Sequence, residues 1–185
     1  MAGDQSNRFN IVEQIESRAM HLSNCLDDIE KIVPDIESGK WTKDTDPVAV
    51  GSLGFIESDE PWYKEIHDAM EHATEIFLSN TGRDISDYTH QFNFHRIVRW
   101  ETKNKPITEH KDVWDPKGDE KIPALTLVMY LTSDYEGGIF RFPLLNKAIK
   151  PLAGDIIIFN SDTVHAIDEY LGGRRMTIRR FLFKK

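Results

Sequence analysis

The chain of 185 residues contains a single cysteine, Cys25, and therefore cannot form an internal disulfide. This scarcity is typical of proteins that fold in a reducing compartment, so we expect a cytoplasmic location. No apolar run approaches the roughly 20 residues that a membrane-spanning helix needs, so we expect no membrane association. The first ten residues have no apolar stretch and include Asp4, which argues against a secretory signal.

Glycine and proline are also few, at 11 and 8 residues, while 39% of the residues are hydrophobic and 29% are charged. These proportions exclude collagen-like, coiled-coil and wholly disordered chains. A chain of this length can bury one core of ordinary size without disulfides or a second domain. We therefore expect residues 1–185 to form a single domain.

Basic side chains are scarce in the first half of the chain. Residues 1–90 carry 7 basic and 19 acidic side chains, whereas residues 91–185 carry 16 and 12. An acidic front half disfavours binding along a nucleic-acid backbone. The more basic second half could accept a small anionic ligand, although a solvated surface of uneven composition is the simpler explanation.

Helical patterns dominate residues 1–87, which we expect to form a helical support region. One apolar run at helical spacing follows Ser23, a suitable N-cap, and ends at Pro34. A second begins with Pro61 at the first helical position and ends near Gly82. Between them we expect a loop over residues 47–54.

Five histidines and the cysteine show no ligand pattern of their own. His67 and His72 lie off the apolar stripe of the second helical run, so we expect them to be solvated. Cys25 lies at a helical core position and is expected to be a small buried hydrophobe. We expect structural or surface roles for His21, His90 and His95.

Residues 88–185 change to the pattern of β-strands. Short segments rich in β-branched and aromatic residues alternate with turn-forming segments. The strand-like segments are FNFHRIVRW, IPALTLVMYL, GIFRF, GDIIIF, TVHAI and RMTIRRFLF. Helices followed by six or more closely spaced strands predict a mostly β fold, in which N-terminal α-helices pack against an antiparallel barrel or jelly roll.

Three residues in this second half have the pattern of a mixed nitrogen and oxygen metal site. His110 and Asp112 are two residues apart, so on an extended strand both side chains leave the same face. His165, at the end of a later strand, is the natural third ligand. Two imidazoles and one carboxylate on one side of an iron ion leave its other positions open for ligands. An HxD pair alone is weak evidence, because a surface histidine beside a solvated aspartate looks the same.

The order of the surrounding motifs strengthens this interpretation. HKD is followed by a strand ending in YL, then EGGIFRF, AGDIIIF, a histidine and an Arg-x-Thr strand. In this order and spacing, residues 91–183 resemble the iron(II)- and 2-oxoglutarate-dependent dioxygenases, most closely their prolyl-hydroxylase-like branch. The resemblance implies a double-stranded β-helix over residues 88–185, with His110, Asp112 and His165 as the metal ligands.

The resemblance also assigns residues to the co-substrate 2-oxoglutarate. Arg175 occupies the position of the base that binds its distal carboxylate, and a guanidinium suits that bidentate contact. The hydroxyls of Thr177 and Tyr130 are placed to reach the same carboxylate. Trp100 stands where related proteins often have a tyrosine near the co-substrate, so a hydrogen bond from this position is not expected.

Arg174 is an alternative to Arg175 as this anchor. Strand alternation places Arg175, Thr177 and Arg179 on one face of the last strand and Arg174, Met176 and Ile178 on the other. Met176 and Ile178 are apolar, as expected for a face packed on core. The polar face should therefore line the interior of the jelly roll, which favours Arg175.

The resemblance implies an enzyme that uses Fe(II), 2-oxoglutarate and O2, with ascorbate as a stimulant. Its reaction would release succinate and CO2 and hydroxylate an unactivated C–H bond of a small molecule, peptide or protein, such as free or peptidyl proline. One alternative is an alkylation-repair demethylase acting on nucleic acid, for which Arg174 and Arg180 supply an R-x5-R spacing. Another is a jelly-roll binding module without turnover.

The substrate is not readable from the sequence. Specificity in such folds comes from loops at the mouth of the barrel. Here we expect those loops over residues 44–56 and 114–121. Trp114 and Asp115, directly after the HxD pair, either line the mouth of the site or pack the loop. The oligomeric state is equally open.

Overall fold

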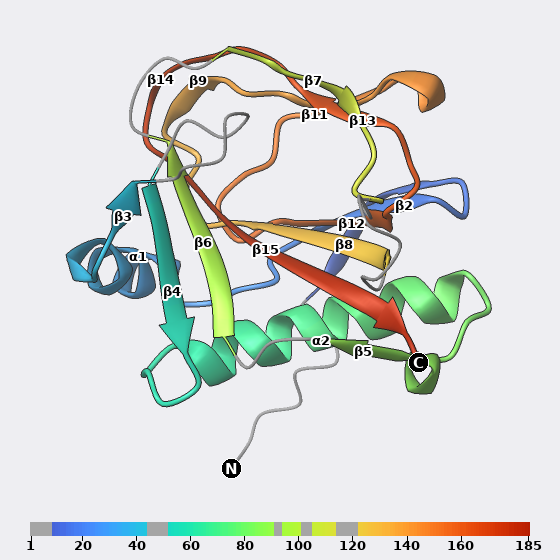
Figure 1. Ribbon diagram of the computed structural model, residues 1–185, viewed down its shortest axis with the longest axis horizontal. Helices are drawn as coiled ribbons and strands as arrows, with labels where there is room; N and C mark the ends of the chain where they lie inside the picture. The colour runs from blue at the N-terminus through green and yellow to red at the C-terminus, as the bar shows by residue number, and fades with distance from the viewer. Residues whose placement is uncertain (1–8, 44–51, 91–93, 101–104, 114–121) are drawn as a thin grey trace.

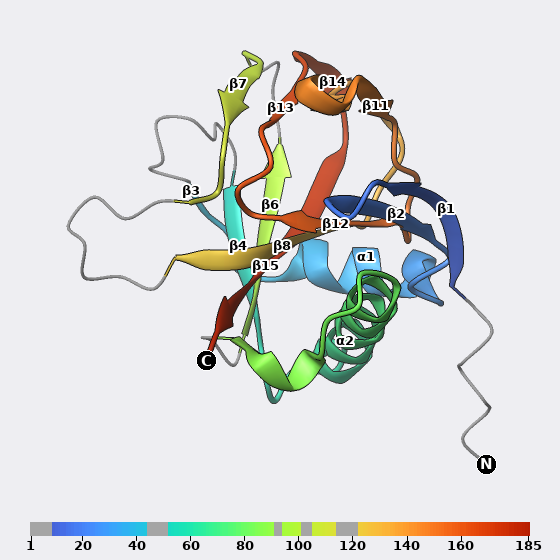
Figure 2. The ribbon, with the colours of Figure 1, turned by 90° about the vertical axis from the view of Figure 1, so that its right-hand side faces the viewer.

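The computed structural model describes residues 9–43, 52–90, 94–100, 105–113 and 122–185. In these residues a small sheet, a large sheet and a pair of α-helices are stacked as three layers (Figures 1 and 2). Strands pair antiparallel within both sheets. Two facing antiparallel sheets confirm the predicted jelly-roll core with supporting helices.

The large sheet forms the middle layer and collects strands from both ends of the chain. Its long central strand β15 lies between β8 and β6, and β5 extends the far end of β15. In spatial order its strands are β1 (Asn10–Ile15), β2 (Ala19–Ser23), β12 (Ile156–Asn160), β8 (Pro123–Tyr130), β15 (Arg175–Lys184), β6 (Phe94–Trp100), β4 (Ser52–Glu57) and β3 (Thr42–Lys43), with β5 spanning Tyr88–His90.

The small sheet covers one face of the large one. A two-stranded pair, β9 (Tyr135–Gly137) with β14 (Tyr170–Gly173), lies beside it. Two short 3-10 helices, η2 (Ile85–Asp87) and η3 (Pro143–Leu145), complete the described elements. The strands of the small sheet are, in order, β11 (Lys147–Ile149), β10 (Phe140–Phe142), β13 (His165–Ile167) and β7 (Ile107–His110).

Strand alternation divides the apolar side chains of the large sheet between two cores. On β12, Ile156 and Ile158 pack toward the helices, whereas Ile157 and Phe159 pack toward the small sheet. On β15, Met176 and Ile178 belong to the helix-side core, as the sequence predicts. The opposite face of β15 therefore points into the space between the two sheets.

The two predicted helices exist, but the first has different bounds. Helix α2 spans Tyr63–Asn80 and buries most of its predicted apolar stripe. Helix α1 spans Ile29–Ser38, so Cys25 precedes it and Pro34 lies inside it. Pro34 is exposed, and the carbonyl that loses its partner there can bind water instead. Neither helix has the combination of length and apolar character that crossing a membrane demands.

The described part of residues 1–87 is less helical than the sequence indicates. The hairpin of β1 and β2 adds two strands to one edge of the large sheet, and β4 pairs with β6 at the other side. Part of the expected loop over residues 47–54 therefore begins a strand, because Ser52 is the first residue of β4. These segments become strands because they pair with other strands of the sheet, and a local sequence pattern does not encode such pairing.

Candidate active site

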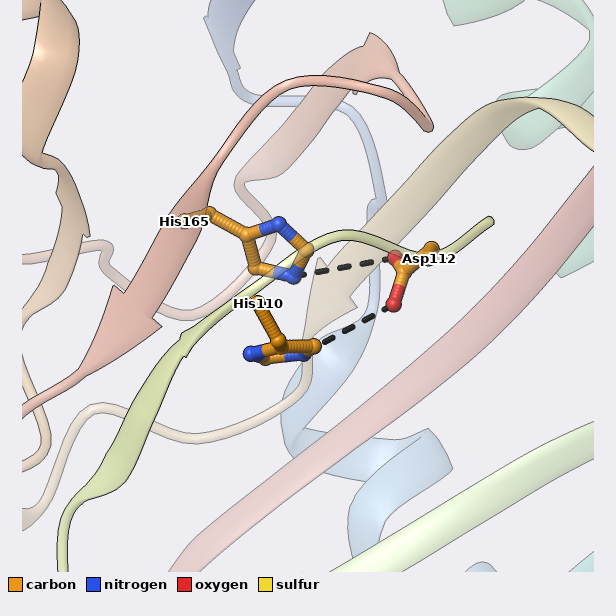
Figure 3. Close-up of side chains that lie close together, drawn as sticks. All are labelled: His110, Asp112 and His165. Atoms are coloured by element: carbon orange, nitrogen blue, oxygen red, sulfur yellow. Dashed lines mark ion pairs between the residues drawn. The ribbon is translucent and has the colours of Figure 1, made fainter. Parts of the chain in front are cut away.

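His110, Asp112 and His165 come together at one end of the space between the sheets (Figure 3). His110 ends β7 and pairs in register with His165, the first residue of β13. Each Nε2 lies 3.7 Å from a different oxygen of Asp112, Oδ1 for His110 and Oδ2 for His165. Atoms at that separation can both bind one ion at a usual bond length of about 2.1 Å. The ligand atoms of all three residues lie within 4.8 Å of one another.

Backbone carbonyls fix the tautomer of both imidazoles. The Nδ1–H of His110 donates to the Thr108 carbonyl at 2.9 Å, and that of His165 donates to the Thr163 carbonyl at 3.0 Å. A carbonyl can only accept, so the proton is on Nδ1 and the lone pair is on Nε2. Both Nε2 atoms face Asp112, as a shared metal would require.

Asp112 is held by its neighbours on the large sheet. The Thr126 hydroxyl donates to Asp112 Oδ2 at 2.8 Å, and the hydroxyls of Thr126 and Ser161 are 2.9 Å apart. The Asp112 backbone N–H also donates to the Ser161 carbonyl at 2.9 Å. These contacts fix the carboxylate at the position where two strands of the large sheet meet the loop after β7.

Apolar surroundings keep His165 neutral. It is almost fully buried, its ring stacks on Phe140 and it contacts Phe159. This burial lowers the pKa of His165 below its usual value, although the nearby Asp112 carboxylate opposes the shift. A neutral imidazole is the form that binds a metal.

Arg175 and Thr177 line the same cavity as the three metal-ligand candidates. Both are buried, at 2% and 3% exposure. Arg174 directly precedes β15 and points away from the cavity, with its exposed guanidinium bonded to Asp134 and Glu37. The register deduced from alternation is therefore the one the chain adopts.

The Arg175 guanidinium is enclosed by aromatic rings and has no acidic partner in the described part of the chain. It lies 4.5 Å from the Trp100 ring centroid, and its Nη2 donates to the Tyr130 hydroxyl at 3.4 Å. Its Nε, although buried, has no hydrogen-bond partner among the described residues. Trp100 thus contributes a stacking face at this position. A buried charge without a counter-charge is costly, so the site fits an anionic ligand.

Both groups that the sequence implies fit these residues. The neutral Nε2 atoms and the Asp112 carboxylate suit a divalent transition metal, with its remaining positions left open. A dicarboxylate such as 2-oxoglutarate would match the unpaired charge of Arg175, which lines the same cavity. The donor set and the unpaired guanidinium are independent observations, and they lie in one cavity.

Sequence reasoning misses two residues of this site. Thr126 stands on the same strand face as Tyr130, and a polar residue inside that apolar strand is a usable signal. Tyr135 lies beside Arg175, whose Cζ is 6.0 Å from its ring centroid, and burial raises its pKa; its position in a turn-like segment hides it.

His67 contradicts the expectation that it is solvated. Its Nδ1 accepts a 2.7 Å hydrogen bond from Arg180, and Glu71 follows one helical turn later. His95, expected to be structural or superficial, is buried at 2% exposure beside the same group. Cys25 is buried, as expected, although it lies outside a helix.

The predicted specificity loops are not described by the structure. Residues 114–121, which include Trp114 and Asp115, lie outside the described residues, as do residues 44–51.

Comparisons with known proteins agree with this geometry. The model of the 2OG-Fe(II) oxygenase superfamily matches residues 92–183, about half of the chain. No curated protein matches the chain significantly.

Several solved structures share the fold. A viral collagen prolyl hydroxylase from Paramecium bursaria Chlorella virus-1, in complex with 2OG, superposes with a TM-score of 0.68 at 18% identity, covering 91% of this chain and 96% of that one. A 2OG-Fe(II) oxygenase family oxidoreductase from Burkholderia pseudomallei gives 0.65 at 15% identity, with coverages of 92% and 86%. A Pseudomonas putida prolyl-4-hydroxylase gives 0.64 at 14% identity, with coverages of 90% and 92%.

Proposed function

Because this chain belongs to the 2OG-Fe(II) oxygenase superfamily, we propose that it is a prolyl-hydroxylase-like member, which hydroxylates an unactivated C–H bond of a free or peptidyl amino acid such as proline. The reaction would consume 2-oxoglutarate and O2 and release succinate and CO2. Two of the similar structures are prolyl hydroxylases, which supports this choice of substrate class.

One observation carries the proposal: the three metal-ligand candidates share a single cavity with a buried arginine that has no acidic partner in the described residues. A structural metal site would not need the arginine, and a purely structural arginine would be paired. Together they define a cavity for a metal and an anion side by side. That pairing is what a metal-dependent enzyme with a carboxylate co-substrate requires.

We assign the roles in this cavity as follows. His110, Asp112 and His165 would hold Fe(II), which supplies the activation of O2 when it is bound with 2-oxoglutarate. Arg175 would bind the distal carboxylate of the co-substrate, with Thr177 and Tyr130 as hydroxyl partners and Trp100 as a stacking face.

The protein also keeps this site in one arrangement. Thr126 fixes the orientation of Asp112, so the carboxylate is in position before the metal arrives. Phe140 and Phe159 cover the buried side of His165 and exclude water from it. Both effects favour a single geometry for the reacting groups.

The demethylase alternative depends on the R-x5-R spacing of Arg174 and Arg180, and the positions of these two side chains do not support it. Arg174 is exposed and bound to acidic side chains, and Arg180 lies on the helix side of the large sheet, bonded to Glu71. Neither of these arginines lines the cavity. Their spacing therefore does not place a guanidinium pair at the metal.

The proposal is tested by anaerobic titration with Fe(II) and 2-oxoglutarate, followed by admission of O2 with ascorbate. Succinate release is then measured with proline-containing peptides, free proline and other free amino acids. We expect one Fe(II) per chain and succinate formation that increases with one class of amino-acid substrate. Stoichiometric metal binding without succinate under any of these conditions would contradict the proposal.

A further inference from the structure

A second, larger hollow lies on the helix side of the large sheet. It is a groove of about 790 Å³ between α1, the start of α2 and strand β4, within the range of ligand-binding sites. Among the residues that the structure describes, the groove and the metal cavity share no lining residue. The sheet separates the two, because Ile97 faces the groove while its neighbour Val98 faces the cavity.

Two tryptophans form the apolar part of this groove. The Trp62 indole N–H donates to the Asp35 carboxylate at 2.8 Å, which fixes the ring at the end of α1. The Trp41 ring lies against Gly54, where a Cβ would come within 3.3 Å of it. Phe55 adds an apolar side chain that is 43% exposed. The aromatic surface is therefore held in place and partly open to solvent.

The rim of the groove is acidic. Asp35, Glu57 and Glu60 are exposed and line it, and among the described lining residues only Lys40 is basic. The surrounding sequence has the same bias, with 19 acidic and 7 basic side chains in residues 1–90. Carboxylates beside indole rings favour cations, because both attract positive charge.

The chain itself shows that a guanidinium suits these rings. Arg99 lies over Trp41, with its Cζ 4.2 Å from the ring centroid. This contact occupies part of Trp41, whereas Trp62 is half-buried and has Asp35 at its edge. A cation bound at Trp62 would therefore contact both the π-face of the indole and the Asp35 carboxylate.

We propose that this groove, defined by Asp35, Trp41, Phe55, Glu57, Glu60 and Trp62, docks a lysine- or arginine-rich segment of another polypeptide. An acidic segment or a nucleic acid would be repelled by the rim, and a neutral segment would leave the carboxylates unused. The groove lies on the opposite face of the large sheet from the metal cavity, so docking there adds recognition beyond the oxygenase reaction. Such rim pairs are individually weak, so the affinity should be modest and should fall with salt.

The test uses fluorescence anisotropy of labelled peptides of equal length, rich in lysine, in glutamate, or in serine and glycine, titrated with the full chain. We expect the lysine-rich peptide to bind at least tenfold more tightly than either of the others. Replacing two rim carboxylates, as Glu57→Gln with Glu60→Gln, should weaken its binding about fivefold. Both side chains are exposed, so the fold should tolerate these changes.

The matched control removes two exposed carboxylates elsewhere, as Glu136→Gln with Glu169→Gln, and should change binding less than twofold. An equal loss in the control would mean attraction by net charge alone and would overturn the proposal. Absence of lysine-peptide binding, or unchanged binding by the rim variant, would also overturn it. Sedimentation velocity should show a monomer; a dimer abolished by the rim changes would instead assign the groove to a second copy.

Discussion

Arg175 and Arg180 lie five residues apart on β15 and are both buried, yet their surroundings are opposite. Arg180 faces the helices, where it donates to Glu71 at 2.6 Å and to His67 at 2.7 Å. Arg175 faces the small sheet, among aromatic rings, without an acidic partner in the described residues. A buried charge must be compensated, so the paired arginine is explained by the fold and the unpaired one by a ligand.

The two faces of the large sheet differ in the same way as these two arginines. The helix side of the large sheet is mostly apolar core, and its buried charge is satisfied within the protein. The cavity side places Thr177, Arg175 and the metal-ligand candidates around one space. Polar groups that a protein leaves facing a cavity are thus better evidence for function than buried polarity alone.

The largest effect should come from the metal ligands. We expect His110→Ala, Asp112→Ala and His165→Ala each to weaken Fe(II) binding at least 100-fold, since losing even a supporting residue around a metal typically costs 10- to 100-fold. Anaerobic Fe(II) titration measures this, and circular dichroism checks the fold. Lys111→Ala is the matched control, because Lys111 lies between two ligands and is exposed. An equal loss of Fe(II) binding in Lys111→Ala would contradict the assignment of His110, Asp112 and His165 as the metal ligands.

The next effect should come from the unpaired arginine. Arg175→Ala should raise the apparent constant for 2-oxoglutarate at least thirtyfold, at the lower end of the roughly 2 to 5 kcal/mol lost when one partner of a buried charge pair is removed. Succinate release against co-substrate concentration gives the constant. Arg174→Ala is the control and should change it less than threefold. A larger loss in Arg174→Ala would contradict the register of β15.

Stability should separate the two buried arginines directly. Arg180→Met leaves Glu71 and His67 without their partner, so we expect the free energy of unfolding to fall by about 2 kcal/mol. Arg175→Met removes an uncompensated charge, so the ligand-free protein should keep or gain stability. Urea denaturation of both variants without metal or 2-oxoglutarate makes the comparison. A similar loss in both would mean that Arg175 also has a structural role.

Acid should destabilise the helix side through His95. This side chain is buried, and burial lowers its pKa from 6.5 to about 3. The unfolded chain therefore binds a proton below pH 6.5 that the folded protein excludes, and stability is lost as the pH falls from 6.5 toward 3. Between pH 8 and pH 5 we expect a loss of about 2 kcal/mol. Urea midpoints for the wild type and for His95→Asn test this, and an unchanged pH slope in the variant would reject it.

The smallest effect should come from Thr177. Thr177→Val keeps the shape and removes one neutral donor, which is worth about 1 kcal/mol, or roughly fivefold in the apparent constant for 2-oxoglutarate. The assay is the same succinate titration used for Arg175. A loss as large as that of Arg175→Ala would show that the hydroxyl, and not the guanidinium, is the main anchor.

The site is more predictable from the sequence than the fold around it, for a physical reason. The strand period of two fixes which side chains share a face, so alternation alone separates Arg175 and Thr177 from Arg174. Spacing predicts that His110 and Asp112 lie together, although Asp112 lies in the bend after β7 and not on the strand itself. The approach of His165 depends on pairing between distant strands, and only the resemblance to a family supplies it.

The N-terminal region resists prediction because its turns lack the usual signals. Glu16, Asn24 and Asp28 all adopt positive φ, a conformation that glycine would have marked. The turn at Glu16 closes the hairpin of β1 and β2, and Asp28 precedes α1. The environment of His67 is unpredictable for a different reason, since its partner Arg180 is 113 residues away.

The most direct test of the central claim is succinate release by Asp112→Ala supplied with Fe(II), 2-oxoglutarate, O2 and a substrate that the wild type accepts. The Asp112 carboxylate lies 3.7 Å from the Nε2 atoms of both His110 and His165 and accepts a hydrogen bond from Thr126. Without this carboxylate, the two histidines should not form a working metal site. We expect no succinate above the protein-free background from a variant whose circular dichroism is unchanged. Succinate release at the wild-type rate would contradict the assignment of this cavity as the active site.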